Sequence, residues 1–181
     1  MAKVLIPLAQ GCEELEAVTL IDLLRRAGIE TITAGLDERP IQASRGVTLI
    51  ADTTLDQVLE QEFDMIILPG GQPGTDNLSA DVRIIALLKK MAHTGKYLCA
   101  ICAAPSVLAA AGLLTGKRAT CYPGSLNGVS DVLLSAAQVV KDGKIITSRG
   151  PGTAMDFALE LIETLLGKAR RDAVETELQR L

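Results

Sequence analysis

The sequence predicts an α/β fold with a mostly parallel sheet that helices cover on both faces. Short apolar runs alternate along the chain with segments whose apolar residues recur at helical spacing. The apolar runs are nearly continuous, which is typical of parallel strands buried on both faces. No linker, low-complexity stretch or internal repeat divides the 181 residues. We therefore expect a single domain over residues 1–181.

The elements of the first half follow from apolar runs and stop signals. Residues 3–9 are a short apolar run that ends before a glycine, as a buried strand does. Residues 13–27 have helical periodicity, with glutamates first, arginines last and Gly28 as the terminator. A second strand is expected at 30–35. The pattern then predicts a short strand near 47–50 and a helical piece near 54–60.

The second half repeats this alternation. Residues 63–68 are a continuous apolar strand, and a helix at 79–93 ends near Gly95. Another buried strand covers 96–101 and leads into a helix rich in small residues at 103–114. The remaining expected elements are a strand at 117–122, a hairpin at 137–148 with its turn at Asp142-Gly143, a helix at 152–166 that Pro151 can start, and a charged helical tail at 168–180.

The composition excludes several classes of function. With 18 Lys and Arg against 22 Asp and Glu the net charge is −4, and there are only two Tyr, two Phe and no Trp. Nucleic-acid binding usually needs a basic face or clustered aromatic rings, so no nucleic-acid partner is expected. No apolar run is long enough to span a membrane, and the first residues do not resemble a signal peptide. These features predict a soluble cytoplasmic protein with no membrane partner.

Cys102 is the strongest candidate for a reactive side chain. It directly follows the predicted strand at 96–101 and precedes a helix, so the chain must turn at a tight elbow. We expect strained backbone dihedrals there, and a thiol pKa lowered by the start of the helix. The alternative is a small buried side chain, as most free cysteines are. Cys99 completes a C-x-x-C pattern, but its place inside the strand argues against a redox pair.

Three segments should converge with Cys102, because active sites of such sheets lie at the carboxyl ends of the strands. They cover residues 10–16, 69–71 and 101–104. The two glycines of the middle segment, Gly70 and Gly71, predict either a simple turn or an oxyanion hole made of backbone N–H groups.

The acidic opening of the first helix contains three glutamates. Favourable charge at a helix N-terminus explains Glu13 and Glu14. Glu16 lies deeper in the helix and closer to its apolar face, where burial would raise its pKa. A protonated Glu16 could donate a hydrogen bond to a thiolate or move a proton. The single histidine, His93, is expected only to end a helix, so neither a metal site built on histidines nor a Cys-His pair is predicted.

Taken together, these segments resemble the ThiJ/PfpI family, in the branch of the parkinsonism-associated protein deglycase and its bacterial relatives. The resemblance covers nearly the whole chain. It rests on Glu13-Glu14-Leu15-Glu16, Arg25-Arg26-Ala27-Gly28-Ile29, Ala34-Gly35-Leu36, Leu68-Pro69-Gly70-Gly71, Ala100-Ile101-Cys102-Ala103-Ala104-Pro105 and Thr147-Ser148-Arg149-Gly150-Pro151-Gly152-Thr153.

The resemblance implies a flavodoxin-like three-layer sandwich, a homodimer and specific roles for site residues. Cys102 would be the nucleophile and Glu16 its protonated partner. The amides implied for the oxyanion hole are those of Gly70, Gly71 and Ala103, and the positions implied near the pocket or the dimer contact are Asp22, Arg26, Arg45 and Tyr122. Tyr122 stands where some members have a histidine, and Ala103 where protease-like members have one, which argues against a protease.

The implied activity is that of a glyoxalase or protein deglycase without metal or organic cofactor. Its substrates would be methylglyoxal, glyoxal, or their early adducts on thiols and amines, and its role protection against carbonyl stress. The alternative is a redox-sensing oxidative-stress protein or chaperone that uses the same oxidisable cysteine. A third role, in thiamine metabolism, finds no phosphate-binding motif in the sequence.

Overall fold

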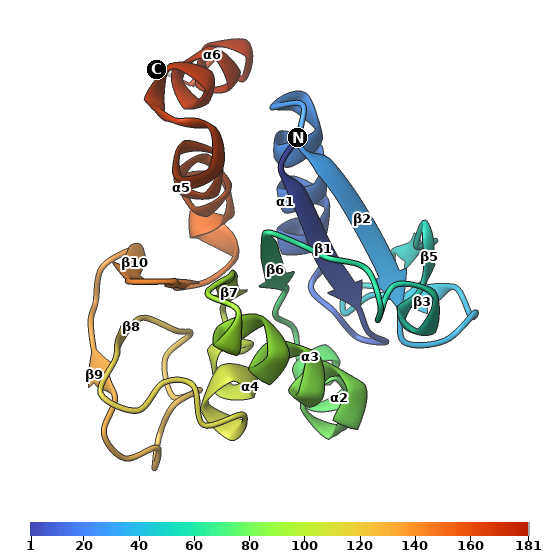
Figure 1. Ribbon diagram of the computed structural model, residues 1–181, viewed down its shortest axis with the longest axis vertical. Coiled ribbons are helices and arrows are strands. Elements are labelled where there is room, and N and C mark those ends of the chain that lie inside the picture. The colour runs from blue at the N-terminus through green and yellow to red at the C-terminus, as the bar shows by residue number, and fades with distance from the viewer. Residues whose placement is uncertain (181) are drawn as a thin grey trace.

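The central sheet has the strand order β10-β11-β7-β6-β1-β2-β5. Neighbouring strands are parallel except for β10 and β11, which form an antiparallel hairpin at one edge. The computed structural model describes residues 1–180, and Figure 1 shows the sheet with helices on either side. The mostly parallel α/β fold predicted from the sequence is confirmed.

The sheet strands are β1 Lys3–Leu8, β2 Glu30–Gly35, β5 Thr53–Thr54, β6 Met65–Leu68, β7 Tyr97–Ile101, β10 Val139–Asp142 and β11 Ile145–Ser148. Two small ribbons lie outside it, one of β3 Ile41–Gln42 and β4 Thr48–Leu49, the other of β8 Arg118–Ala119 and β9 Leu133–Leu134. The helices are α1 Glu14–Arg26, α2 Gly74–Ala80, α3 Val82–His93, α4 Pro105–Ala110, α5 Ala154–Leu166 and α6 Lys168–Glu177, with short 3₁₀ turns at Leu55–Gln57 and Pro151–Thr153.

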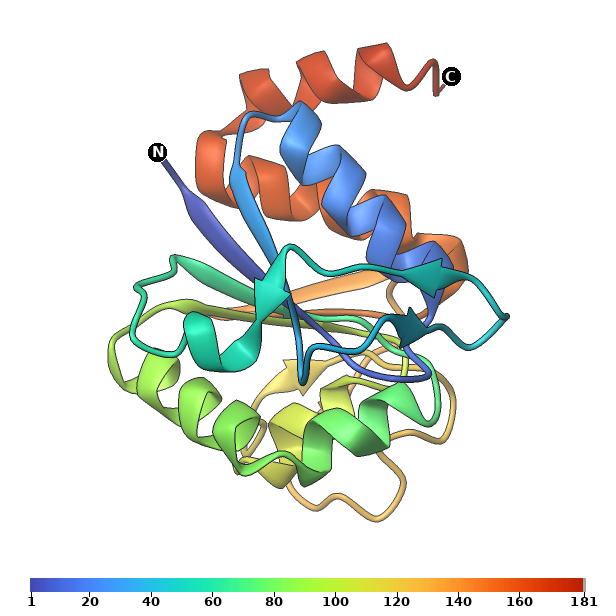
Figure 2. The same ribbon diagram turned by 90° about the vertical axis from the view of Figure 1, so that its right-hand side faces the viewer.

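Two apolar cores sandwich the sheet. Successive residues of a strand point to opposite faces. Ile6 packs with α1 and α5 on one face, whereas Leu5 packs with α3 and α4 on the other. Figure 2 shows the corresponding layers: α1, α5 and α6 lie above the sheet, and α2, α3 and α4 lie below it.

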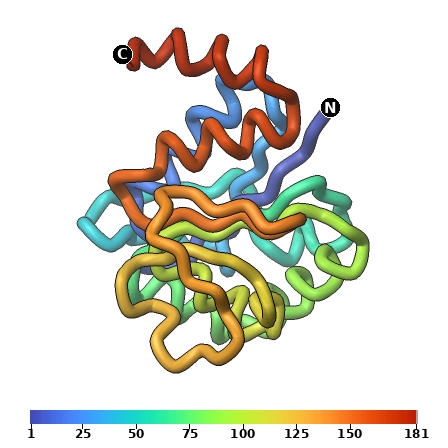
Figure 3. Tube along the Cα trace, turned by 90° about the vertical axis from the view of Figure 1, so that its left-hand side faces the viewer, coloured from blue at the N-terminus to red at the C-terminus, as the bar shows by residue number. Residues whose placement is uncertain are grey.

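The α1–α5 layer is closed by the C-terminal helix. Val174 of α6 is fully buried, and the Arg170 side chain donates hydrogen bonds to the carbonyls of Arg26 and Ala27 at the end of α1. Those carbonyls lack partners within the helix, so Arg170 satisfies them. Gly28 then ends α1 with a φ of +76°, as the sequence predicted. Both chain termini lie on this side of the molecule (Figure 3).

Several predicted elements are corrected in their bounds. The helix expected at 79–93 begins only at Val82, because extended Asp81 caps α3 by accepting the Arg83 N–H, and the preceding helix α2 was not predicted. The strand expected near 47–50 is one arm of the β3–β4 ribbon. The elements expected at 54–60, 103–114 and 117–122 shrink to Leu55–Gln57, Pro105–Ala110 and Arg118–Ala119.

The topology places a crevice beside β1. The chain passes from β1 to β2 on one side, while β6 pairs with β1 on the other. Ligand crevices of such sheets lie outside the carboxyl ends of strands at this reversal of order. In residues 1–180 no helix is long and apolar enough to cross a membrane.

Candidate active site

Cys102 occupies a strained elbow. It follows β7 directly and has a φ of +65°, a conformation that residues other than glycine rarely adopt. Its N–H donates to the Ser148 carbonyl on β11 at 3.0 Å, which holds the turn against the sheet. The strained backbone expected for this position is confirmed. Such strain persists only where the surroundings impose it, and it is common at functional sites.

Gly70 brings the end of β6 into contact with this elbow. A Cβ on Gly70 would lie 2.6 Å from the Cβ of Cys102 and 2.8 Å from Oε2 of Glu16. No side chain fits in that space. The glycine therefore allows β6, β7 and α1 to meet, and the three segments expected to converge do so.

Glu16 is fully buried beneath the elbow. Its Oε2 accepts the Gly70 N–H at 2.8 Å. Its Oε1 has no hydrogen-bond partner within residues 1–180, and the Cys102 thiol lies close enough to lower the Glu16 pKa. Burial raises the pKa of Glu16 to about 7, against the opposing effects of Gly70 and Cys102. A large share of Glu16 is therefore protonated at neutral pH, as its position in the helix suggested.

The pKa of the Cys102 thiol differs from the one expected. Its pKa is raised to about 12, first by burial, then by the negative charge of Glu16 and by their hydrogen bond. The N–H groups of Ala103 and Gly71 oppose the rise. The expected lowering by a helix start is wrong, because α4 begins only at Pro105 and desolvation dominates.

The two groups therefore titrate as a pair. Two adjacent negative charges in a buried site are unfavourable, so near neutrality the pair holds at most one. When the proton is on Glu16, its carboxyl no longer repels the thiolate and donates a hydrogen bond to it instead. Two of the three causes that raise the Cys102 pKa are then removed. The thiolate is accessible only with Glu16 protonated.

The oxyanion-hole prediction is corrected at one position. The Gly70 N–H is already bonded to Glu16, so it is not available to a substrate oxygen. The N–H groups of Gly71 and Ala103 have no backbone acceptor within residues 1–180, and both are near the Cys102 sulfur. Gly71 has a φ of +89°, which a glycine adopts without strain. These two amides remain as donors for a developing negative charge.

Glu14 holds the second wall of the site. Its carboxylate accepts the N–H of Arg45 at 2.9 Å and the hydroxyl of Ser44 at 3.1 Å. Burial alone would raise the pKa of Glu14, but hydrogen bonds from its own N–H, from Arg45, Val47 and Ser44 keep it below its ordinary value. Helix-dipole stabilisation, the explanation given by the sequence, is thus incomplete: Glu14 fixes the β3–β4 ribbon beside Cys102.

A cavity of about 400 Å³ opens above the elbow. It is lined by Glu13, Ser44, Arg45, Gly71, Gln72, Cys102, Ala103, Tyr122, Ser125 and Pro151. Tyr122 is tied to the elbow by its N–H, which donates to the Cys102 carbonyl at 2.7 Å. The structure therefore brings together Cys102, Arg45, Tyr122 and both free amides.

Two predicted residues lie elsewhere. Asp22 and Arg26 form an ion pair at 2.7 Å on the exposed side of α1, and neither lines the cavity. His93 ends α3 immediately before β7 begins, at the opposite edge of the sheet from Cys102. No group of three or more His, Cys, Asp or Glu side chains in residues 1–180 could hold a metal ion.

The lining residues that sequence reasoning missed are Glu13, Ser44, Gln72, Ser125 and Pro151. Gln72 directly follows the two-glycine turn and could have been found from that position. Ser44 and Ser125 carry no such signal, because they come from loops whose position depends on tertiary contacts.

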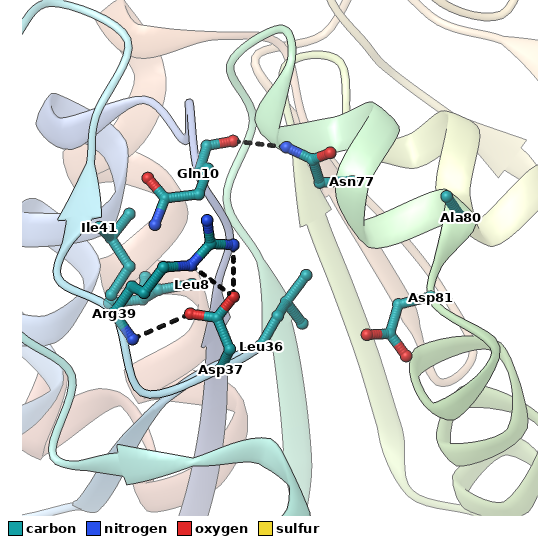
Figure 4. Close-up of a pocket in the computed structure, with 9 residues that line it drawn as sticks. All are labelled: Leu8, Gln10, Leu36, Asp37, Arg39, Ile41, Asn77, Ala80 and Asp81. Atoms are coloured by element: carbon teal, nitrogen blue, oxygen red, sulfur yellow. Dashed lines mark hydrogen bonds and ion pairs between the residues drawn. The ribbon is translucent and has the colours of Figure 1, made fainter.

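A second hollow of about 370 Å³ lies at the carboxyl ends of β1 and β2 (Figure 4). Arg39 folds onto Asp37 there, and the Asn77 amide donates to the Gln10 carbonyl. Its charged and amide side chains already have partners within the chain, and its lining contains no cysteine, serine or histidine. The cavity at Cys102 is therefore the better candidate for chemistry.

Comparison with known proteins gives consistent matches. A model of the DJ-1/PfpI family matches residues 2–164. The chain is 35% identical over 179 residues to "Glutathione-independent glyoxalase DJR-1.2" of Caenorhabditis elegans, covering 96% of this chain and 92% of that protein. The crystal structure of Drosophila melanogaster DJ-1beta superposes with a TM-score of 0.96 at 40% identity, covering 99% of this chain and 98% of that one.

A plant relative is much longer than the matched region. "Protein DJ-1 homolog B" of Arabidopsis thaliana is 42% identical over 171 residues, which is 93% of this chain but 39% of that protein. The present chain thus spans well under half the length of this relative.

Proposed function

Since the chain belongs to the DJ-1/PfpI family, we propose that it is a cysteine-dependent enzyme acting on methylglyoxal, glyoxal or their early adducts on thiols and amines. The observation that carries the proposal is the buried pair of Cys102 and Glu16 on a strained elbow, with two free amides beside the sulfur. The name of the C. elegans relative supports the same substrate class.

The first step is addition of sulfur to a carbonyl. Cys102 either passes its proton to the Glu16 carboxylate or, when Glu16 is already protonated, reacts as the thiolate. The sulfur then attacks the aldehyde carbon of methylglyoxal and forms a hemithioacetal. The carbonyl oxygen gains negative charge as the C–S bond forms, and the N–H groups of Gly71 and Ala103 are near enough to the sulfur to stabilise it.

The second step moves a hydrogen between adjacent carbons. A base removes the proton from the former aldehyde carbon, giving an enediol, and a proton returns to the neighbouring carbon. This converts the hemithioacetal to a thioester of lactate without any external oxidant. Water then hydrolyses the thioester to lactate and free Cys102. Glu16, with a pKa of about 7, can both give and take protons at neutral pH.

The adduct substrates use the same steps. An amine or thiol adduct of methylglyoxal dissociates to the free amine or thiol and the aldehyde, and Cys102 then adds to that aldehyde to form the same hemithioacetal. The product is again a hydroxy acid, and the carrier is released unmodified. No metal or organic cofactor takes part in this scheme.

One specific feature favours oxidation of Cys102 as a second candidate function. The free amides of Gly71 and Ala103, with protonated Glu16, are three donors around one sulfur. Such donors would also stabilise the oxygens of a sulfinic acid, as a redox sensor requires.

The experiment that tests the enzyme proposal follows lactate formation from methylglyoxal by the wild type and by Cys102→Ser. We expect turnover by the wild type and none above background by the variant. Equal lactate formation by both would overturn it. Modification of Cys102 by peroxide without any turnover of methylglyoxal would favour the redox sensor instead.

We also propose that the chain forms a homodimer through the exposed side of α1. Leu15, Val18, Asp22 and Arg26 recur at helical spacing along that side. Leu15 and Val18 are about half exposed, and Val47 on the neighbouring ribbon is also exposed. Glu14 ties the ribbon to α1, so these apolar side chains belong to one surface. This proposal gives Asp22 and Arg26 a place at the contact rather than in the cavity.

A further inference from the structure

An outer hollow adjoins the cavity at Cys102. This outer hollow has a volume of about 270 Å³ and shares Tyr122 and Pro151 with the inner cavity. The Tyr122 ring is half exposed and lies 3.5 Å from the position of a Cβ on Gly150. The Tyr122 side chain therefore borders both spaces.

The outer hollow has a single charged side chain, Arg149. One guanidinium nitrogen donates to the Ala136 carbonyl at 3.1 Å, and no carboxylate of residues 1–180 lies within ion-pair distance. Six other arginines do form ion pairs: Arg25, Arg26, Arg39, Arg83, Arg171 and Arg180. Arg149 thus has donors left for an anion from outside the chain.

Arg149 is also held in place by the sheet. It directly follows β11, and its backbone N–H donates to the Gln138 carbonyl at 3.1 Å. The preceding Ser148 hydroxyl donates to the same carbonyl at 2.9 Å. A group on an ordered strand end holds a ligand more accurately than one on a free loop. Ser148 also accepts the Cys102 N–H, so Arg149 and the nucleophile are positioned by neighbouring atoms.

From this arrangement we propose that the preferred substrate is an α-oxoaldehyde with an anionic arm, whose carboxylate or phosphate reaches Arg149 across Tyr122. The inference rests on the proposed function, because it concerns the substrate of the same cysteine. Methylglyoxal has three carbons and would occupy the inner cavity alone. A longer substrate would place its carbonyl at Cys102, its spacer along the Tyr122 ring and its anion in the outer hollow.

The test compares phenylglyoxal with two derivatives that carry a para carboxylate or a para phosphate. The measured quantity is the ratio of kcat/KM for each charged probe to that for phenylglyoxal. One exposed guanidinium contact predicts a ratio about five- to tenfold lower in Arg149→Gln than in the wild type. The probe that loses more identifies the preferred anion.

Two further variants sharpen the comparison. Arg118→Gln removes another arginine that forms no ion pair within residues 1–180 and lines neither hollow, and it should leave the ratio unchanged. Gly152→Asp puts a carboxylate into the outer hollow, where an added Cβ meets no atom within 4 Å, and should lower the ratio by repulsion. If all probes react but Arg149→Gln keeps the wild-type ratio for both anions, the inference is overturned while the proposed function stands. If the wild type turns over none of the three probes, the proposed function fails and the inference falls with it.

Discussion

Two glutamates of α1, two residues apart, have opposite protonation behaviour. Glu14 accepts several hydrogen bonds, which keep its pKa below the ordinary value, whereas burial raises that of Glu16 to about 7. Environments that separate the pKa values of neighbouring acids assign them different roles. Glu14 acts as a fixed negative charge that positions the β3–β4 ribbon, and Glu16 is the group able to exchange a proton with Cys102.

Removing the charge of Glu16 should lower the thiol pKa. In Glu16→Gln the amide still accepts the Gly70 N–H and offers its own N–H to the sulfur, while the negative charge is gone. Because Glu16 contributes two of the causes that raise the Cys102 pKa, we expect a fall of about one unit or more. Thiolate absorbance, with Cys102→Ser as the blank for the other cysteines, measures it. An unchanged pKa would mean that Glu16 does not interact with the thiol.

The raised pKa of Glu16 also predicts how stability depends on pH. An unfolded glutamate has a pKa of about 4.3. Between that value and about 7 the folded state holds more protons than the unfolded state, so this group's contribution falls as pH rises. The difference of about 2.7 between these pKa values corresponds to a total loss of at most about 4 kcal/mol.

The measurement is the free energy of unfolding by denaturant at about pH 5 and about pH 8. Other carboxyls with lowered pKa values act in the opposite direction, so the informative quantity is the difference between wild type and Glu16→Gln. The wild type should lose more stability than the variant as pH rises. Parallel pH dependence of the two proteins would contradict a protonated Glu16.

At the scale of elements, apolar periodicity was sufficient for every major strand and for α1 and α5. It failed where tertiary contacts decide the outcome. Asp81 delays the start of the predicted helix to Val82, because its side chain caps α3, and α2 before it was not predicted. The β3–β4 ribbon depends on the carboxylate of Glu14, which comes from thirty residues earlier in the chain and leaves no local signal.

The same contrast between local pattern and tertiary contacts holds for the residues of the site. The elbow at Cys102 and the burial of Glu16 follow from local order: a strand, a cysteine, a helix, and a carboxyl on the apolar face. Whether each backbone N–H is free to bind a substrate oxygen does not follow from local order. Gly70 and Gly71 are equivalent in sequence, yet only the first is bonded to Glu16. Likewise, the raised thiol pKa depends on burial that sequence cannot measure.

Gly70 should not tolerate a side chain at the junction of β6, β7 and α1. In Gly70→Ala the new methyl would lie 2.6 Å from the Cβ of Cys102 and 2.9 Å from the Ile101 carbonyl, so the elbow must move. Overpacking of this kind costs about 1–3 kcal/mol. Gly152→Ala is the matched control, because its methyl would meet no atom within 4 Å. Thermal unfolding that destabilised both variants equally would contradict the close contact at Gly70.

At the scale of the whole molecule, the exposed side of α1 predicts self-association. Val18→Glu would put an unpaired carboxylate in the proposed contact, and we expect the dimer dissociation constant to rise about tenfold or more. Val82→Glu is the control, since Val82 is 79% exposed at the start of α3 on the opposite face of the sheet. Sedimentation equilibrium distinguishes the cases. A wild type that is monomeric at micromolar concentration, or a Val18→Glu variant that still dimerises normally, would count against this surface.

The fold brings the candidate catalytic groups together at one place. The strained end of β7, the glycine turn after β6 and the buried acid of α1 meet at the carboxyl edge of the sheet, and the β3–β4 ribbon forms the opposite wall. In the proposed reaction Cys102 attacks a carbonyl there, and Glu16 moves the protons that follow. The Glu16→Gln variant cannot transfer these protons, so the first adduct should accumulate in it.

Intact-protein mass spectrometry under native conditions, directly after mixing with methylglyoxal, gives the most sensitive test of this reaction. We expect Glu16→Gln to retain one methylglyoxal adduct, while the wild type accumulates little and forms lactate. Cys102→Ser should lack that adduct and form no lactate. An adduct pattern unchanged by Cys102→Ser, together with undiminished lactate formation, would contradict the account.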